Sequence, residues 1–175
     1  MKSKDERLSK QLGDFGEQLV MFIIGRCYSH RVALVDHVGV DVIATDCEWE
    51  EKESKKYGIS VKTRVFTKDD PSFDFDENQQ EKLVEFSKGF GLTPMVAFVC
   101  VDSLENAEVN FDVYFIELED FRRLAVDDTF KGISITGINK TNLRFSNAKS
   151  NQKYLQNHEL INHHRLTLKS KDLKL

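Results

Sequence analysis

Apolar and polar positions follow a helical period at the start of this chain of 175 residues. In residues 3–28, apolar side chains recur at spacings of three and four, which predicts one long helix with a single apolar stripe. The stripe consists of Leu8, Leu12, Phe15, Leu19, Phe22 and Ile23. Gly13 and Gly16 interrupt this helix at about 1 kcal/mol each relative to alanine. We therefore expect another part of the chain to approach the helix closely there.

The period then changes to that of strands. Three short runs, 31–37 (RVALVDH), 39–46 (GVDVIATD) and 57–64 (YGISVKTR), follow one another with short or polar connections. Sequential strands with short connections predict an antiparallel meander. A helix over 76–91 comes next, with a glycine as its stop signal. Residues 94–102 (PMVAFVCVD) form a near-continuous apolar run, which is typical of a central strand buried on both faces.

The last third of the chain has weaker patterns. We expect a strand that ends near Glu117, a short helix over 118–126, and late strands within 132–138 and 142–148. Residues 151–166 (NQKYLQNHELINHHRL) predict a closing helix. Together these elements predict a three-layer α/β domain, with a mixed central sheet flanked by helices.

Composition is that of a soluble globular protein, with 40% hydrophobic and 31% charged residues. No apolar run approaches the roughly 20 residues that a transmembrane helix needs, so we expect no membrane span. The three cysteines, Cys27, Cys47 and Cys100, are odd in number, far apart and without a CxxC pair. This pattern favours reduced, mostly buried thiols in a cytoplasmic protein.

Charge is distributed unevenly around the net value of −4. Residues 139–175 hold 8 Lys+Arg and 2 Asp+Glu, a net of +6, which indicates a basic C-terminal arm on an acidic body. Lys153 and Arg165 in this arm are either part of a solvated helix or an electrostatic footprint for a nucleic-acid backbone. The histidines of the arm lack the four-residue spacing that places two metal ligands on one helical face, which favours a solvated helix.

Three charged side chains stand in apolar surroundings: Glu17 in GDFGEQLV, Asp41 in VGVDVIA and Lys62 in ISVKTR. Aspartate is disfavoured in strands, so Asp41 is either on a polar face or kept for a function. Neighbouring strands lie about 5 Å apart, so Asp41 and Lys62 can be neighbours in the meander. Acids beside a lysine suit metal-assisted phosphodiester hydrolysis, in which Mg²⁺ binds carboxylates, water and phosphate, and the lysine neutralises developing charge. Taken singly, each of the three can also be an ordinary solvated charge.

The order GxxGE on a helix, GVDVIA on one strand and SVK on the next resembles the PD-(D/E)XK nuclease superfamily, with its restriction-endonuclease-like fold. The resemblance covers about residues 12–101. It implies that Asp41 binds the metal, Mg²⁺ or Mn²⁺, and that the backbone carbonyl of Val61 completes the metal site. It also implies that Lys62 is the catalytic lysine and Glu17 the helix glutamate found in many members.

Ser60 departs from this pattern, because the family has an acid two residues before the lysine. A serine hydroxyl is neutral and a weak magnesium ligand. Glu77 or Glu81 on the following helix, or Asp46 or Glu48 at the hairpin end, can replace the missing acid. The sequence therefore leaves two readings open: a metal-dependent endonuclease, or a catalytically impaired nuclease-like domain that binds nucleic acid or a protein partner. An unrelated α/β interaction domain is a third reading.

The resemblance also sets the expected organisation. Residues 1–138 would form the nuclease-like α/β domain, and residues 139–175 a basic extension, a strand plus a helix, packed on the same domain. The expected substrate is DNA, with Arg64, Lys153 and Arg165 as candidate phosphate contacts. Since many relatives cut two strands as dimers, a homodimer is the default expectation.

Overall fold

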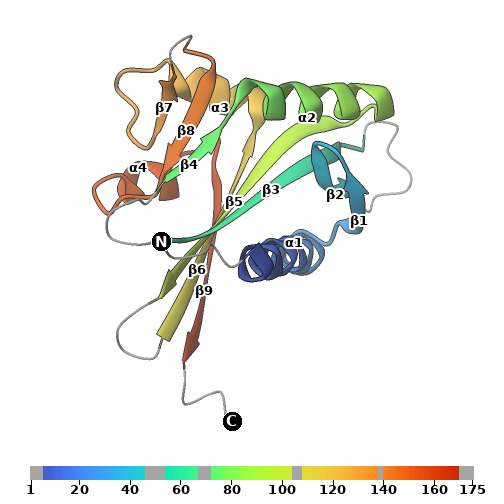
Figure 1. Cartoon of the computed structure of the whole chain (residues 1–175), viewed down its shortest axis with the longest axis horizontal. Coiled ribbons are helices and arrows are strands. Elements are labelled where there is room, and N and C mark those ends of the chain that lie inside the picture. Colours follow the sequence, from blue (N-terminus) through green and yellow to red (C-terminus); the bar gives the residue numbers. More distant parts are fainter. Residues whose placement is uncertain (1–5, 46–53, 67–71, 104–107, 138–139, 170–175) are drawn as a thin grey trace.

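The computed structural model describes residues 6–45, 54–66, 72–103, 108–137 and 140–169 (Figure 1). The predicted fold class is confirmed: a mixed α/β fold in which helices flank a central sheet. In chain order the elements are α1 (Glu6–Cys27), β1 (Arg31–His37), β2 (Val40–Thr45), β3 (Lys56–Phe66), β4 (Ser72–Phe75), α2 (Glu77–Phe90), β5 (Thr93–Ser103), β6 (Glu108–Glu117), α3 (Leu118–Ala125), β7 (Ile133–Thr136), β8 (Asn142–Ser146), α4 (Gln152–Gln156) and β9 (Asn162–Lys169).

The central sheet has six strands in the order β1-β2-β3-β5-β6-β9. The first three form the predicted antiparallel meander. β3 and β5 pair in parallel from Tyr57↔Thr93 to Phe66↔Asp102. The β5–β6 and β6–β9 pairs are antiparallel, which makes the sheet mixed. Strands β4, β8 and β7 form a second, smaller antiparallel sheet in the order β4-β8-β7.

The two faces of the central sheet carry different layers, and Figure 1 shows α1 and α2 on opposite sides of it. On one face, Val20, Ile23 and Ile24 of α1 pack against apolar side chains of β2, β3, β5 and β6. On the other face, Leu83 of α2 and Phe121 of α3 join the aromatic side chains of the small sheet in a second core cluster. The sheet is therefore covered on both faces, as a three-layer arrangement requires.

The predicted helix at the start of the chain is confirmed, but its predicted apolar stripe faces the sheet only in part. Ile23 is buried, and Leu12 and Leu19 pack against the core, whereas Leu8 is 64% and Phe22 is 58% exposed. Val20 and Ile24, which are outside the predicted stripe, complete the buried face of the helix. Gly16, which approaches Thr63 of β3, lies on this side of the helix.

Alanine should have opposite effects on stability at Gly16 and at Gly13, which serves as the control. A Cβ at Gly16 would lie 1.8 Å from Oγ1 of Thr63 on β3, whereas a Cβ at Gly13 meets nothing within 4 Å. We expect Gly16→Ala to lower the free energy of unfolding by about 1–3 kcal/mol through overpacking. Gly13→Ala should raise it by up to about 1 kcal/mol through helix propensity. Urea denaturation measures both, and equal effects would contradict this packing of α1 on β3.

The C-terminal arm differs from its prediction. The expected helix over 151–166 is wrong: α4 covers only Gln152–Gln156, and Asn162–Lys169 forms β9, an edge strand antiparallel to β6. The reason is tertiary, because His163 and Arg165 of β9 both bond to the buried Asp112 of β6. The four-residue strand β4 was also not predicted.

The cysteines follow their prediction only in part. Cys100 is buried, as predicted, but Cys27 is exposed, and Cys47 lies outside the described residues. Burial raises the pKa of the Cys100 thiol well above 9.0, since the thiolate would lose its hydration. Among the helices of the described residues, none is long and apolar enough to cross a bilayer.

Candidate functional site

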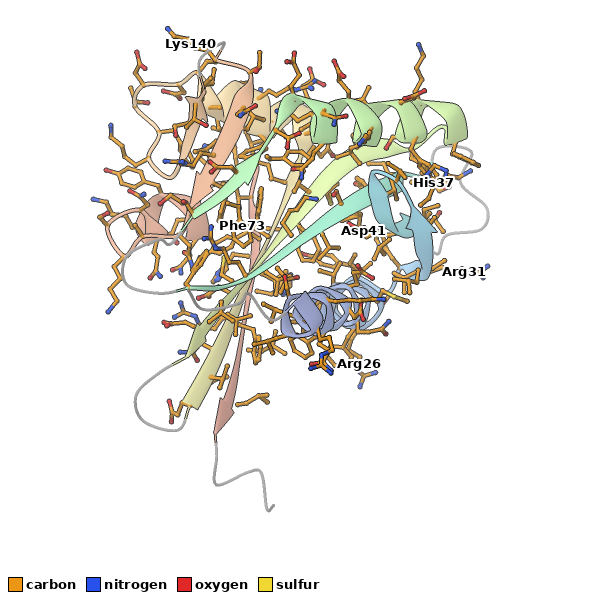
Figure 2. The ribbon with its side chains drawn as sticks, in the orientation of Figure 1. Arg26, Arg31, His37, Asp41, Phe73 and Lys140 are labelled. Atoms are coloured by element: carbon orange, nitrogen blue, oxygen red, sulfur yellow. The ribbon has the colours of Figure 1, made fainter. Side chains whose placement is uncertain are left out.

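Asp41 begins the candidate site, at the start of β2 and beside β3 (Figure 2). The β2–β3 ladder runs from Thr45↔Lys56 to Val42↔Ile59. Next along β3, the Val61 backbone N–H donates to Asp41 Oδ2 at 2.6 Å, and the Ser60 hydroxyl donates to the same oxygen at 3.4 Å. A side-chain carboxylate thus binds the backbone where the ladder ends, which holds Asp41 in a fixed position against β3.

Lys62 is the positive charge of the site and is half-buried. Its ammonium lies 5.5 Å from the ring centroid of Phe75. Burial lowers the pKa of the Lys62 amine below 10.5, while the negative charges of Asp41 and Asp76 oppose this shift. Asp41 and Lys62 are therefore electrostatic neighbours, as the order of the strands predicted.

The pKa of Asp41 is shifted in the opposite direction. Burial raises it above 3.8, against the lowering effects of the Val61 N–H, the Lys62 charge and the Ser60 hydroxyl. The site therefore holds a carboxylate and an ammonium that are both poorly hydrated. Such perturbed, interacting pairs occur at functional sites as well as in structural ion pairs.

Asp76 is the site residue that the sequence reasoning missed. It is the N-cap of α2, and its Oδ1 accepts the Gln79 N–H at 2.8 Å. Its charge acts on the Lys62 ammonium, since β4 and Phe75 bring the start of α2 to this face of β3. An aspartate directly before a helical pattern is a recognisable N-cap signal, but nothing local indicates that the cap also faces Lys62.

Glu17 lies on α1, on the other side of the sheet. It is half-buried on α1 and follows Gly16, which packs against Thr63. Adjacent side chains of a strand point to opposite faces, so Thr63 faces α1 while Lys62 faces α2. The catalytic role of Glu17 stays a prediction.

The expected replacements for the missing acid make none of the contacts described above. Glu77 and Glu81 are exposed on α2, and Asp46 and Glu48 lie outside the described residues. Among the described residues there is no group of three or more His, Cys, Asp or Glu side chains placed to hold a metal ion. The structure therefore offers no protein-made cage for a cation in the part of the chain that it describes.

The donors around Asp41 nevertheless fit a cation held mainly by water and substrate. Both hydrogen bonds to Asp41 end on Oδ2, so neither occupies Oδ1. In an antiparallel pair, the N–H and C=O of one residue face the same neighbour, so the Val61 carbonyl points to the same side as its N–H. Mg²⁺ is commonly bound by one or two carboxylates, with waters and phosphate completing its shell. Asp41 and the Val61 carbonyl match that pattern, with Ser60 as a weak third oxygen.

The candidate phosphate contacts have intramolecular partners. Arg64 is exposed, and its guanidinium donates to the Ser72 carbonyl at 2.6 Å. The Lys153 ammonium lies 4.8 Å from the ring centroid of Tyr154. Arg165 donates two bonds, of 2.7 and 2.8 Å, to Asp112. Any phosphate contact by Arg165 would thus compete with a carboxylate of its own fold.

Comparison with known proteins adds a likeness of the overall arrangement. No family model matches this chain, and no curated protein does. Among solved structures, the chain is similar to Hjc of Archaeoglobus fulgidus, a Holliday junction resolvase from an archaeal hyperthermophile. The two are 14% identical, the match covers 78% of this chain and 84% of that one, and the TM-score is 0.44.

Proposed function

We propose that this chain is a metal-dependent nuclease that hydrolyses phosphodiester bonds in DNA at a site built on Asp41 and Lys62. The observation that carries the proposal is the half-buried Lys62 ammonium, which lies just beyond the end of the β2–β3 ladder. The negative charges of Asp41 and Asp76 both act on this ammonium. A poorly hydrated ammonium binds a phosphate oxygen strongly, because it has less water to lose.

Each residue then has a defined task. Lys62 would neutralise the negative charge that grows on the phosphoryl oxygens in the transition state. Asp76 would orient the Lys62 ammonium, and Asp41 with the Val61 carbonyl would hold Mg²⁺ or Mn²⁺. When bound, such an ion polarises the phosphoryl oxygen and makes a coordinated water acidic. Burial raises the pKa of Asp41 in the metal-free chain, because the ionised carboxylate is poorly hydrated. A bound divalent cation would offset this unfavourable burial.

A second candidate function is binding of DNA without cleavage. Ser60 is neutral where the resembling family has an acid, and the described residues contain no three-acid group. Both observations favour weak metal affinity. This alternative predicts DNA binding that weakens steeply with salt, because neutralised phosphates release counterions.

The test is cleavage of supercoiled plasmid by the full chain in Mg²⁺ and in Mn²⁺. We expect Asp41→Asn to lower the cleavage rate by about 10²–10³-fold, as for other groups that stabilise transition-state charge. Asp76→Asn should reduce it less, by about tenfold, because this carboxylate acts through Lys62.

Glu85→Gln is the matched control, since Glu85 is an exposed acid on the helix that Asp76 caps and has no proposed role at the site. It should leave the rate unchanged. Cleavage that survives Asp41→Asn, or that falls equally in Glu85→Gln, would overturn the assignment. Salt-sensitive binding by the unaltered chain with no cleavage in either metal would establish the alternative.

A further inference from the structure

The outer side of α1 carries an apolar stripe that stays partly exposed after the helix has packed on the sheet. Leu8, Phe15 and Phe22 are 64%, 41% and 58% exposed. Leu12 and Leu19 lie between them along the helix and are half-buried, because they also pack against the core under α1. The fully buried side chains of α1 are Val20, Ile23 and Ile24, so Leu8 and Phe22 are not needed to hold α1 on the sheet.

The spacing within this stripe is that of a helix–helix seam. Leu8, Leu12, Phe15, Leu19 and Phe22 follow one another at intervals of four, three, four and three residues. This is the heptad pattern by which two helices pack against each other side by side. Over 14 residues of helix the stripe is about 21 Å long, at 1.5 Å per residue.

We propose that this stripe is the interface of a homodimer, in which α1 packs antiparallel against α1 of a second copy. A two-fold interface must be self-complementary. Phe15 lies midway between Leu8 and Phe22, so turning the helix end for end places Phe15 opposite Phe15 and Leu8 opposite Phe22 of the second copy. The stripe meets this symmetry requirement without any additional surface.

Charge selects the antiparallel arrangement over the parallel one. Arg26 is exposed and continues the stripe four residues after Phe22. Parallel packing would place Arg26 beside Arg26 of the second copy, and like charges so placed are destabilising. Antiparallel packing separates the two arginines by most of the helix.

The apolar surface continues beyond the helix. The Phe15 ring lies 5.3 Å from the ring of Phe111 on β6, and Phe111 is only 7% exposed. Exposed apolar patches of this kind on one protein mark interaction sites. The dimer would not obstruct the proposed nuclease site, because Lys62 faces α2 on the other side of the sheet. The inference therefore stands whether or not the chain cleaves DNA.

Sedimentation velocity of the full chain over a range of concentrations tests the interface. We expect a dimer, and Leu8→Glu with Phe22→Glu should weaken dimerisation at least 100-fold, since each places a charge in the seam. Val126→Glu is the control, because Val126 is equally exposed, at 64%, but follows α3. A monomeric unaltered chain, or a dimer that resists the double substitution, would overturn the proposal.

Cysteine cross-linking tests the antiparallel arrangement, in a chain with Cys27→Ser and Cys47→Ser and the buried Cys100 retained. Phe15→Cys should form a disulfide-linked dimer on oxidation, and Asp14→Cys, beside it on α1, should not. Leu8→Cys and Phe22→Cys should cross-link when mixed but not singly. Efficient cross-linking of Leu8→Cys to itself would instead indicate parallel helices and overturn the arrangement.

Discussion

Replacing Asp112 by asparagine is expected to lower the free energy of unfolding by about 1–3 kcal/mol, because it removes the charge from a buried carboxylate that accepts hydrogen bonds from two cationic side chains. The Asp112 side chain is 4% exposed, and it accepts bonds from Arg165 at 2.7 and 2.8 Å and from His163 at 2.7 Å. Asparagine keeps the size of the side chain but leaves Arg165 without its countercharge. Urea denaturation at neutral pH measures the loss.

An exposed pair of the same chemistry provides the control. Asp74 and Arg144 also pair across two antiparallel strands, with a 2.8 Å bond, but their side chains are 55% and 45% exposed. Surface ion pairs contribute about 0–1 kcal/mol, so Asp74→Asn should have a small effect. Similar losses in the two variants would show that Asp112 does not anchor β9 to β6.

The pH dependence of the Asp112 effect has a definite sign. Burial alone would raise the pKa of Asp112, but bonds from His163 and Arg165 and their charges hold it below 3.8. A carboxyl whose pKa is lower in the folded state contributes stability that is present above pH 3.8 and lost as the pH falls through the folded value. The difference between the unaltered chain and Asp112→Asn should therefore shrink below pH 3.8. A constant difference down to strongly acidic pH would contradict this origin of the effect.

Much of the central sheet could be predicted because its cues are local. The run from Arg31 to His37 is bounded by turns, and the helix from Glu77 has both an aspartate cap and Gly91 with φ of 64° after it. Alternation, caps and glycines act over a few residues, so they are visible in the sequence.

The C-terminal arm could not be predicted because its cues are remote. β9 has few apolar residues, and its register follows from Asp112, which lies about 50 residues earlier and attracts His163 and Arg165. The same holds for Asp76: its cap position is a local signal, but its approach to Lys62 depends on how β4 and the start of α2 pack against β3. Asp41 and Lys62 were within reach of prediction since their strands are neighbours in sequence and in space.

For the proposed nuclease, replacing Lys62 by methionine is expected to reduce DNA cleavage by about 10²–10³-fold, because it removes the positive charge that would stabilise the transition state. Methionine keeps the length and the apolar stem of lysine. The control is Lys88→Met, at an exposed lysine in the last turn of α2, which should leave cleavage unchanged. A Lys62→Met chain that cleaves at the original rate would remove Lys62 from the mechanism.

Stability measurements on the same residues separate the ion pair from the chemistry. Burial lowers the pKa of Lys62, so between that pKa and 10.5 the unfolded chain holds a proton that the folded chain has lost. The stability of the unaltered chain should therefore rise with pH in this window relative to Lys62→Met. Burial raises the pKa of Asp41, so the stability should fall as the pH rises just above 3.8, an effect that Asp41→Asn abolishes.

The double variant Asp41→Asn with Lys62→Met separates stability from chemistry. Burial is the largest cause of both pKa shifts. We therefore expect the double variant to have a free energy of unfolding at least as large as that of the unaltered chain while cleaving no DNA, because two poorly hydrated charges have been removed together. A double variant that is less stable than either single variant would mean that the pair holds β2 against β3 rather than being kept for the reaction.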